Sequence, residues 1–206
     1  YVADQCLIIA GTGSNNTAHS IHLSVAAEKA GADALLVVSP YYNKATPEGM
    51  IMHYRSICEA VSIPVIIYNV PSRTGLDIPV SVYEALSSIP NIAGVKEANP
   101  DITKIAKIRY TCGPNFPIWS GNDDQIVPVM ALGGQGVISV LSNVLPKETA
   151  TICNAVKRGD FHTAADLQCR FLPLIDALFS EVNPIPVKAA MKEIGYDCGT
   201  CRLPLC

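Results

Sequence analysis

The chain has 206 residues, of which 49% are hydrophobic and 16% charged, and its formal net charge is −3. This composition is that of an ordinary globular protein able to bury one sizeable core. The chain has no run of Lys or Arg that would attract nucleic acid or an anionic membrane, and no apolar stretch of about 18 residues. Residues 1–5 lack the features of a signal peptide. We therefore predict a cytoplasmic protein that binds neither nucleic acid nor membrane.

Short apolar, β-branched runs alternate with amphipathic stretches of helical period along the first 140 residues. The predicted strands are residues 7–10, 34–38, 64–68, 92–95, 117–119 and 136–140. The predicted helices between them are residues 18–30, 48–61, 80–87, 102–110 and 124–132. This alternation is typical of βαβ units that build a parallel sheet. After residue 140 the pattern predicts helices only, at residues 147–157, 161–179 and 186–194.

Functional chemistry follows nearly every predicted strand. Examples are Gly11-Thr12-Gly13, Ser39-Pro40-Tyr41-Tyr42, Tyr68-Asn69, Lys96-Glu97 and Ser120-Gly121-Asn122, and Ser139 is expected within the sixth strand. Polar groups at all strand ends are typical of the top face of a (β/α)8 barrel, whereas an open doubly wound sheet concentrates them at one switch point. We therefore predict an α/β fold of the TIM-barrel type, with a partial barrel at residues 1–140 and a helical region at residues 141–206.

Two motifs suggest cofactors, and neither is complete. Gly11-Thr12-Gly13 could begin a dinucleotide fingerprint, but Asn16 occupies the position of its third glycine and no acidic ribose ligand is evident. Cys198, Cys201 and Cys206 place three thiols close together, as in a zinc knuckle or a redox pair, but no fourth ligand is near. The other five cysteines are scattered singly, where cysteine behaves as a small hydrophobe: Cys6, Cys58, Cys112, Cys153 and Cys169. We predict reduced cysteines, no metal and no cofactor.

Lys96 stands out because it directly follows a strand predicted to be buried, where lysine is rarely found. Burial lowers the pKa of an amine and so supplies the neutral nucleophile that a Schiff base needs. The alternatives are a lysine that reaches solvent or pairs with Glu97. Tyr68 ends the preceding strand and could transfer protons beside Lys96, or it could be a core aromatic with a solvated hydroxyl. Arg73 follows on the same rim, where a guanidinium can hold a substrate carboxylate.

Seven motifs in order resemble those of the dihydrodipicolinate synthase family, and together they span essentially the whole chain. They are Ala-Gly-Thr-Gly-Ser-Asn at 10–15, Ser-Pro-Tyr-Tyr-Asn-Lys at 39–44, Tyr-Asn-Val-Pro-Ser-Arg-Thr-Gly at 68–75, Gly-Val-Lys-Glu-Ala at 94–98, Ser-Gly-Asn-Asp at 120–123, Gly-Val-Ile-Ser-Val at 136–140 and Asn-Pro-Ile-Pro-Val-Lys at 183–188. The resemblance implies a lyase that condenses pyruvate with aspartate 4-semialdehyde through a lysine Schiff base. The product would be 4-hydroxy-tetrahydrodipicolinate, in diaminopimelate and lysine biosynthesis, and the enzyme a homo-oligomer, a dimer of dimers.

The resemblance also implies roles for individual residues. Lys96 would form the imine, Tyr68 would transfer protons, and Tyr42 would enter the site of a neighbouring subunit to complete a proton relay. The second substrate would be bound through Arg73, Gly121 and Asn122, and Ile138 would place a carbonyl near the imine. The family usually has Asp at the position of Asn122.

A regulatory site is implied as well, at Asn15, His19 and Tyr41. Lysine-sensitive relatives have a carboxylate at the position of His19, and imidazole offers the effector's ammonium no opposite charge. We therefore expect feedback inhibition by lysine to be weak or absent.

The resemblance places two βα units before Tyr1, and the second should carry a Gly-Thr-Thr-Gly-Glu motif that does not occur here. We expect residues 1–206 alone to be inactive, with a gap in the barrel wall beside Leu7, an unpaired strand at Gly136 and a solvent-flooded Lys96. Two alternatives remain open. One is a different class I pyruvate aldolase, acting like N-acetylneuraminate lyase or on a keto-deoxy sugar acid, and the other is a non-catalytic truncated fragment.

Overall fold

The structure, a computed structural model, describes residues 5–206 and contains one six-stranded parallel sheet. Neighbouring strands follow one another in chain order. They are β1 (Ile9–Gly11), β2 (Ala34–Val38), β3 (Val65–Asn69), β4 (Ile92–Glu97), β5 (Ile118–Ser120) and β6 (Gly136–Val137). A sequential order has no reversal at which a doubly wound sheet would bind its ligand. The predicted α/β fold with a curled parallel sheet is therefore confirmed.

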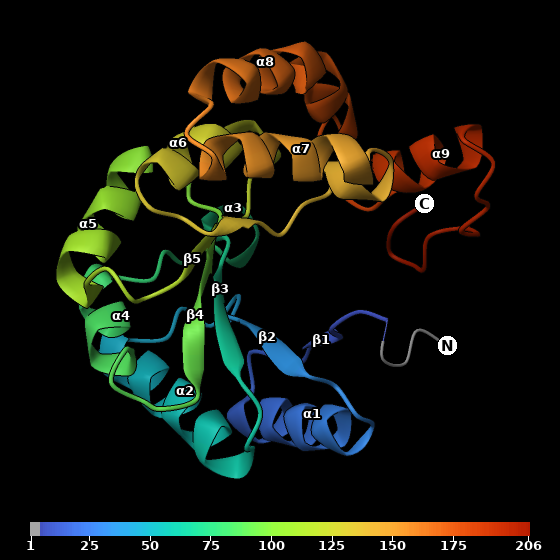
Figure 1. Cartoon of the computed structure of the whole chain (residues 1–206). Coiled ribbons are helices and arrows are strands. Elements are labelled where there is room, and N and C mark those ends of the chain that lie inside the picture. The colour runs from blue at the N-terminus through green and yellow to red at the C-terminus, as the bar shows by residue number, and fades with distance from the viewer. Residues whose placement is uncertain (1–4) are drawn as a thin grey trace.

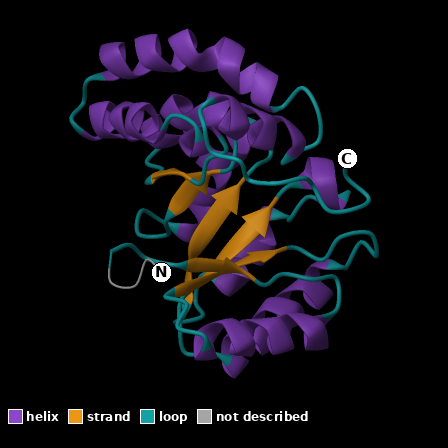
Figure 2. Ribbon diagram, turned by 90° about the vertical axis from the view of Figure 1, so that its right-hand side faces the viewer, coloured by secondary structure: helices purple, strands orange, loops and turns teal. Residues whose placement is uncertain are grey.

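The helices form an arc around one face of the curled sheet, so that the sheet resembles part of a barrel wall (Figure 1). They are α1 (Thr17–Lys29), α2 (Pro47–Ala60), α3 (Pro71–Thr74), α4 (Val80–Leu86), α5 (Ile102–Cys112) and α6 (Ile126–Ala131). In this arc α1 packs on α2, α2 on α4, α4 on α5 and α5 on α6, whereas α3 is a single turn just beyond the third strand. The C-terminal region adds α7 (Pro146–Lys157), α8 (Phe161–Leu178) and α9 (Ile185–Glu193), with short 3₁₀ turns at Asp123–Gln125 and Leu141–Asn143. Figure 2 shows these last helices beyond one end of the strands.

The main core lies between the strands and the helical arc. In β2 the fully buried side chains of Leu35 and Val37 alternate with partly exposed ones, because successive residues of a strand face opposite sides of the sheet. The buried residues pack against Tyr54 of α2 and Tyr83 of α4 in one continuous cluster. Burying a large apolar side chain contributes about 1.5–3 kcal/mol. The core therefore holds each strand against its helices.

The sixth strand is shorter than predicted, and Ser139 lies beyond it. The Ile138 N–H still donates to the Ser120 carbonyl at 2.9 Å, so the ladder reaches this residue. Further along, the N–H groups of Val140 and Leu141 donate to Asp123 Oδ2 instead of to a strand, each at 2.9 Å. The buried carboxylate thus turns the chain out of the sheet and into the 3₁₀ turn at Leu141–Asn143.

The outer strands pair on one side only within the described residues, β1 with β2 and β6 with β5. β1 begins at Ile9 rather than Leu7, whose side chain is 78% exposed. The expectation that all five scattered cysteines act as core hydrophobes is partly wrong, because Cys6 and Cys169 are exposed. No helix in the described part is long and apolar enough to cross a membrane.

Candidate active site

Tyr68 and Lys96 lie side by side at the C-terminal ends of β3 and β4. The two strands pair in parallel with Tyr68 opposite Lys96, and the Lys96 Nζ atom lies 4.2 Å from the centroid of the Tyr68 ring. Both side chains are partly buried. The alternative in which Lys96 pairs with Glu97 is not observed, because Glu97 points to the opposite face of β4 and bonds to Asn69 and Tyr83.

Burial is the main influence on the ammonium group of Lys96. It lowers the pKa of Lys96 from 10.5 to about 8; the nearby negative charge of Asp123 opposes this shift, and the positive charge of Arg73 adds to it. An amine with a pKa of about 8 is half neutral near that pH, and the neutral form is the one that attacks a carbonyl carbon. Lys96 is partly buried, so the expectation that it is flooded with solvent is wrong.

Tyr68 is suited to donate a proton in this environment. Burial raises the pKa of Tyr68, and the charge of Arg73 partly opposes the rise. The phenol therefore stays protonated when the amine beside it is neutral. A protonated phenol next to a nucleophilic amine can give a proton to an oxygen that leaves, and can take it back later.

Arg73 sits on α3, a single turn of helix that begins directly beyond β3. Pro71 starts this helix, and Gly75 ends it in the left-handed conformation, with φ of 69°. The Arg73 side chain is exposed, and its Nη2 atom donates to the Asn183 carbonyl at 3.3 Å. This bond ties the rim of the sheet to the segment that precedes α9.

A cavity of about 540 Å³ joins these groups. It is lined by residues from the strand ends and from the C-terminal region: Tyr68, Val70, Ser72, Arg73, Lys96, Ala98, Gly121, Asn122, Val140, Phe179, Glu181, Val182 and Asn183. Gly121 has to be glycine, because a Cβ atom there would lie 2.6 Å from the Cβ of Ala98. The lining residues within the segment 179–183 bring the C-terminal region into the same cavity as Lys96.

Several lining residues were not assigned a role from the sequence. Residues 179–183 lie far from Lys96 along the chain, and only the motif beginning at Asn183 marked them. Asp123 was also missed as a charge near Lys96. Its side chain is 1% exposed, and its Oδ1 atom has no hydrogen-bond partner within the described residues.

Two residues expected at the site lie outside the cavity lining. Tyr42 is 88% exposed and has a left-handed backbone with φ of 72°. Ile138 follows β6 but does not line the cavity.

The three residues expected to form an effector site come from different elements. Asn15 lies in the loop after β1, His19 on α1 and Tyr41 in the loop after β2. Asn15 and that second loop are in contact, because Asn43 Nδ2 donates to the Asn15 carbonyl at 3.0 Å. His19 and Tyr41 are both exposed. Within residues 5–206, no cluster of three or more His, Cys, Asp or Glu side chains could hold a metal ion.

Comparison with known proteins gives a consistent result. A model of the dihydrodipicolinate synthetase family matches residues 1–206. The 4-hydroxy-tetrahydrodipicolinate synthase of Caldicellulosiruptor saccharolyticus is 54% identical over 204 residues, which are 99% of this chain and 69% of that protein. The dihydrodipicolinate synthase structure from Thermotoga maritima superposes with a TM-score of 0.96 at 40% identity, over 100% of this chain and 71% of that one.

A second solved structure adds a ligand to the comparison. It is the chloride-inhibited dihydrodipicolinate synthase from Acinetobacter baumannii complexed with pyruvate, with a TM-score of 0.95 and 42% identity over 100% of this chain and 70% of that one. The match in sequence and the match in structure thus point to the same enzymes. The chain belongs to the dihydrodipicolinate synthetase family, whose members are lyases.

Proposed function

We propose that this site condenses pyruvate with aspartate 4-semialdehyde, through a Schiff base on Lys96, in the synthesis of diaminopimelate and lysine. The observation that supports it most is the pairing of a lysine whose pKa is about 8 with the Tyr68 ring at 4.2 Å. The pyruvate complex of the Acinetobacter baumannii relative supports the choice of the first substrate.

The first half of the reaction uses Lys96 and Tyr68. The neutral Lys96 amine attacks the ketone carbon of pyruvate, and the carbinolamine loses water after Tyr68 gives a proton to its hydroxyl group. The resulting iminium withdraws electrons, so that the methyl group of pyruvate loses a proton and an enamine forms. The imine provides this activation without a cofactor.

The second half uses the other end of the cavity. The enamine carbon adds to the aldehyde of the second substrate, whose oxygen takes up a proton. The amino group of the same substrate then attacks the iminium carbon, closes the ring and displaces Lys96. Arg73 would hold the substrate carboxylate by two parallel hydrogen bonds, with Gly121 and Asn122 beside the substrate and the Ile138 carbonyl near the imine.

We further infer a homo-oligomer, a dimer of dimers, in which Tyr42 enters the site of a neighbouring subunit. The high exposure and left-handed backbone of Tyr42 support this role, because both hold the phenol away from its own chain. The protein would act in the cytoplasm.

We infer that residues 1–140 form part of an eight-stranded barrel and residues 141–206 a helical region beside it. The unpaired edges of β1 and β6 are where two further βα units would close the wall. Open edges weaken such a wall, so we expect residues 1–206 alone to be inactive. The experiments below therefore use the complete gene product.

Borohydride reduction in the presence of pyruvate should label Lys96 alone, because its amine is the one held neutral inside the cavity. The label is located by peptide mass mapping. Lys96→Met should abolish labelling, and Lys157→Met, at an exposed position of α7, should leave it unchanged. A label on any other lysine would overturn the assignment. Cleavage of N-acetylneuraminate or of a keto-deoxy sugar acid, with no use of aspartate semialdehyde, would favour the aldolase alternative.

The rate of imine formation should rise with pH and level off with an apparent pKa of about 8. Below this pKa the amine is protonated and cannot attack, so the rate should fall about tenfold for each pH unit. Initial rates of borohydride trapping between about pH 6 and pH 10 measure this profile. A rate that still climbs tenfold per unit near the ordinary lysine pKa of about 10.4 would contradict the role of burial.

Arg73→Ala should weaken the use of aspartate semialdehyde far more than imine formation. Without the carboxylate clamp, transition-state stabilisation for this substrate should fall by about 2–4 kcal/mol, as derived from the ratio of the kcat/KM values. The control is Arg158→Ala, because Arg158 is an exposed arginine beyond α7. Steady-state kinetics and pyruvate trapping are compared for both variants. An equal loss in imine formation would remove Arg73 from the second-substrate site.

Inhibition by lysine should be weak at about pH 8, because an imidazole at His19 offers no opposite charge to the effector's ammonium. His19→Glu should lower the half-inhibitory lysine concentration several-fold. His22→Glu is the matched control, since His22 is also exposed and lies one turn along the same helix, with the two rings 6.5 Å apart. Strong inhibition of the unsubstituted protein by millimolar lysine would refute the expectation.

A further inference from the structure

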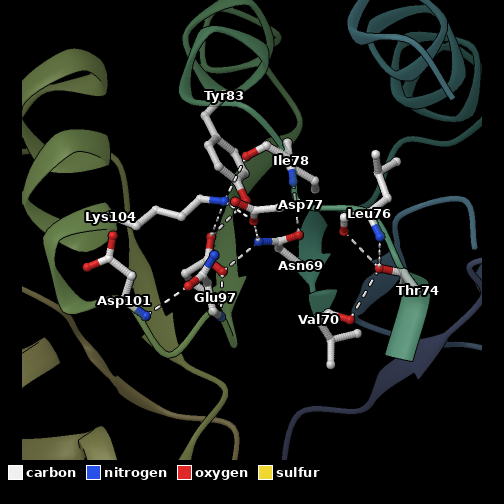
Figure 3. A network of polar contacts seen from close by, with 11 residues as sticks. Asn69, Val70, Thr74, Leu76, Asp77, Ile78, Tyr83, Glu97, Asp101 and Lys104 are labelled. Carbon is white, nitrogen blue, oxygen red and sulfur yellow. Dashed lines mark hydrogen bonds and ion pairs between the residues drawn. The ribbon is translucent and has the colours of Figure 1, made fainter. Parts of the chain in front are cut away.

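A second polar cluster lies behind the candidate site, on the side of β3 and β4 that faces the helices. It consists of Asn69, Asp77, Tyr83, Glu97 and Lys104, shown in Figure 3. Asn69 and Glu97 are the last residues of their strands, and their side chains are 0% and 1% exposed. Such groups are costly to bury unless they are fully hydrogen-bonded.

The two strand-terminal residues are in register, as are Tyr68 and Lys96 immediately before them. Successive side chains of a strand point to opposite faces of the sheet. Tyr68 and Lys96 therefore face the cavity, while Asn69 and Glu97 face the helices. Asn69 and Glu97 thus each follow one residue of the reactive pair, and they lie on the other side of the same two strands.

Asn69 is the centre of the cluster. Its Nδ2 atom donates to Glu97 Oε1 at 2.7 Å and to Asp77 Oδ1 at 2.8 Å, and its Oδ1 atom accepts from the Ile78 N–H at 3.2 Å. Both N–H groups and the carbonyl of the amide are thus engaged. The short bond to Glu97 directly connects the end of β3 to the end of β4.

Glu97 is held by three further groups. Its Oε1 atom also accepts from the Asn99 N–H at 2.8 Å, and its Oε2 atom accepts from the Tyr83 hydroxyl at 2.8 Å. Lys104 Nζ lies 3.9 Å from Oε2 and also forms an ion pair with Asp77. Burial raises the pKa of Glu97, and the positive charge of Lys104 opposes the rise.

A buried ion pair is weak evidence that a cluster of this kind serves stability. Apolar residues of similar volume often hold a buried site as well as an ion pair does, because the charges lose their hydration. Hydrogen bonds add direction, which apolar packing does not have. A network that binds every polar atom of Asn69 fixes how the two strand ends lie against each other.

We propose that Asn69 and Glu97 are positioning residues, whose hydrogen bond across the ends of β3 and β4 holds Lys96 against Tyr68 in the geometry for imine formation. The inference rests on the proposed function, because it assigns Lys96 and Tyr68 their roles. Neither positioning residue touches the substrate. A misplacement of about 1 Å in a reacting group can slow a reaction about a hundredfold, so a bond of this kind has a measurable effect.

The test compares two single variants of the complete gene product that each remove one hydrogen bond to Glu97. Asn69→Leu is close in shape but removes the bond between the strands, together with the bonds of Asn69 to Asp77 and to the Ile78 N–H. The matched control, Tyr83→Phe, removes the bond from the α4 side and leaves Asn69 in contact with Glu97. Thermal unfolding, kcat, the KM for each substrate and the pH profile of pyruvate trapping are measured for both.

We expect both variants to unfold at a lower temperature, but only Asn69→Leu to lose at least about tenfold in kcat and in the rate of imine formation. The apparent pKa of Lys96 should also move from about 8 toward the ordinary lysine value of about 10.4, since the amine would no longer be held inside the site. The KM for aspartate semialdehyde should change little.

Equal rates and equal pH profiles in the two variants would overturn the inference, because the cluster would then act on stability alone. If Asn69→Leu does not fold, Asn69→Ser replaces it, since a serine hydroxyl is too short to reach Glu97. If the unsubstituted protein forms no imine at Lys96, the proposed function fails, and that result is distinct from equal behaviour of the variants.

Discussion

The pairing register of β3 and β4 is the constraint on which the candidate site depends. In this register Tyr68 lies opposite Lys96 and Asn69 lies opposite Glu97. A slip of one residue in a single strand would turn its polar side chains to the wrong face. If β4 slipped, Lys96 would face the helices and Glu97 the cavity. If β3 slipped, Tyr68 would face the helices and Asn69 the cavity. The apolar residues earlier in both strands oppose such a slip, because a slip would also turn their buried side chains to the opposite face of the sheet.

The lowered pKa of Lys96 follows from burial more than from a specific charged partner. Burial lowers its pKa, and the charges of Asp123 and Arg73 act in opposite directions. Asp123 also accepts hydrogen bonds from the N–H groups of Val140 and Leu141. One carboxylate therefore both ends β6 and acts to raise the pKa of the Lys96 amine. A change at Asp123 would therefore alter the shape and the charge of the site together.

The C-terminal region completes the site from a distance. Residues from the segment 179–183 line the cavity, and the Asn183 carbonyl accepts a hydrogen bond from the guanidinium of Arg73. The cavity that holds Lys96 is thus lined partly by a segment that belongs to no strand of the sheet.

The sequence by itself determined the order of the strands and helices, because hydrophobic periodicity and glycine caps are local properties. It also singled out Lys96 and Tyr68, since a lysine at a buried strand end is rare and the surrounding motifs are distinctive. Only the tertiary structure decided that Glu97 turns away from Lys96 to Asn69, that Asp123 ends β6 early, and that residues from the segment 179–183 line the cavity that holds Lys96. Each of these depends on contacts between residues distant along the chain. Local pattern does not encode such contacts, because they form only when the curled sheet brings the strand ends and the C-terminal region together.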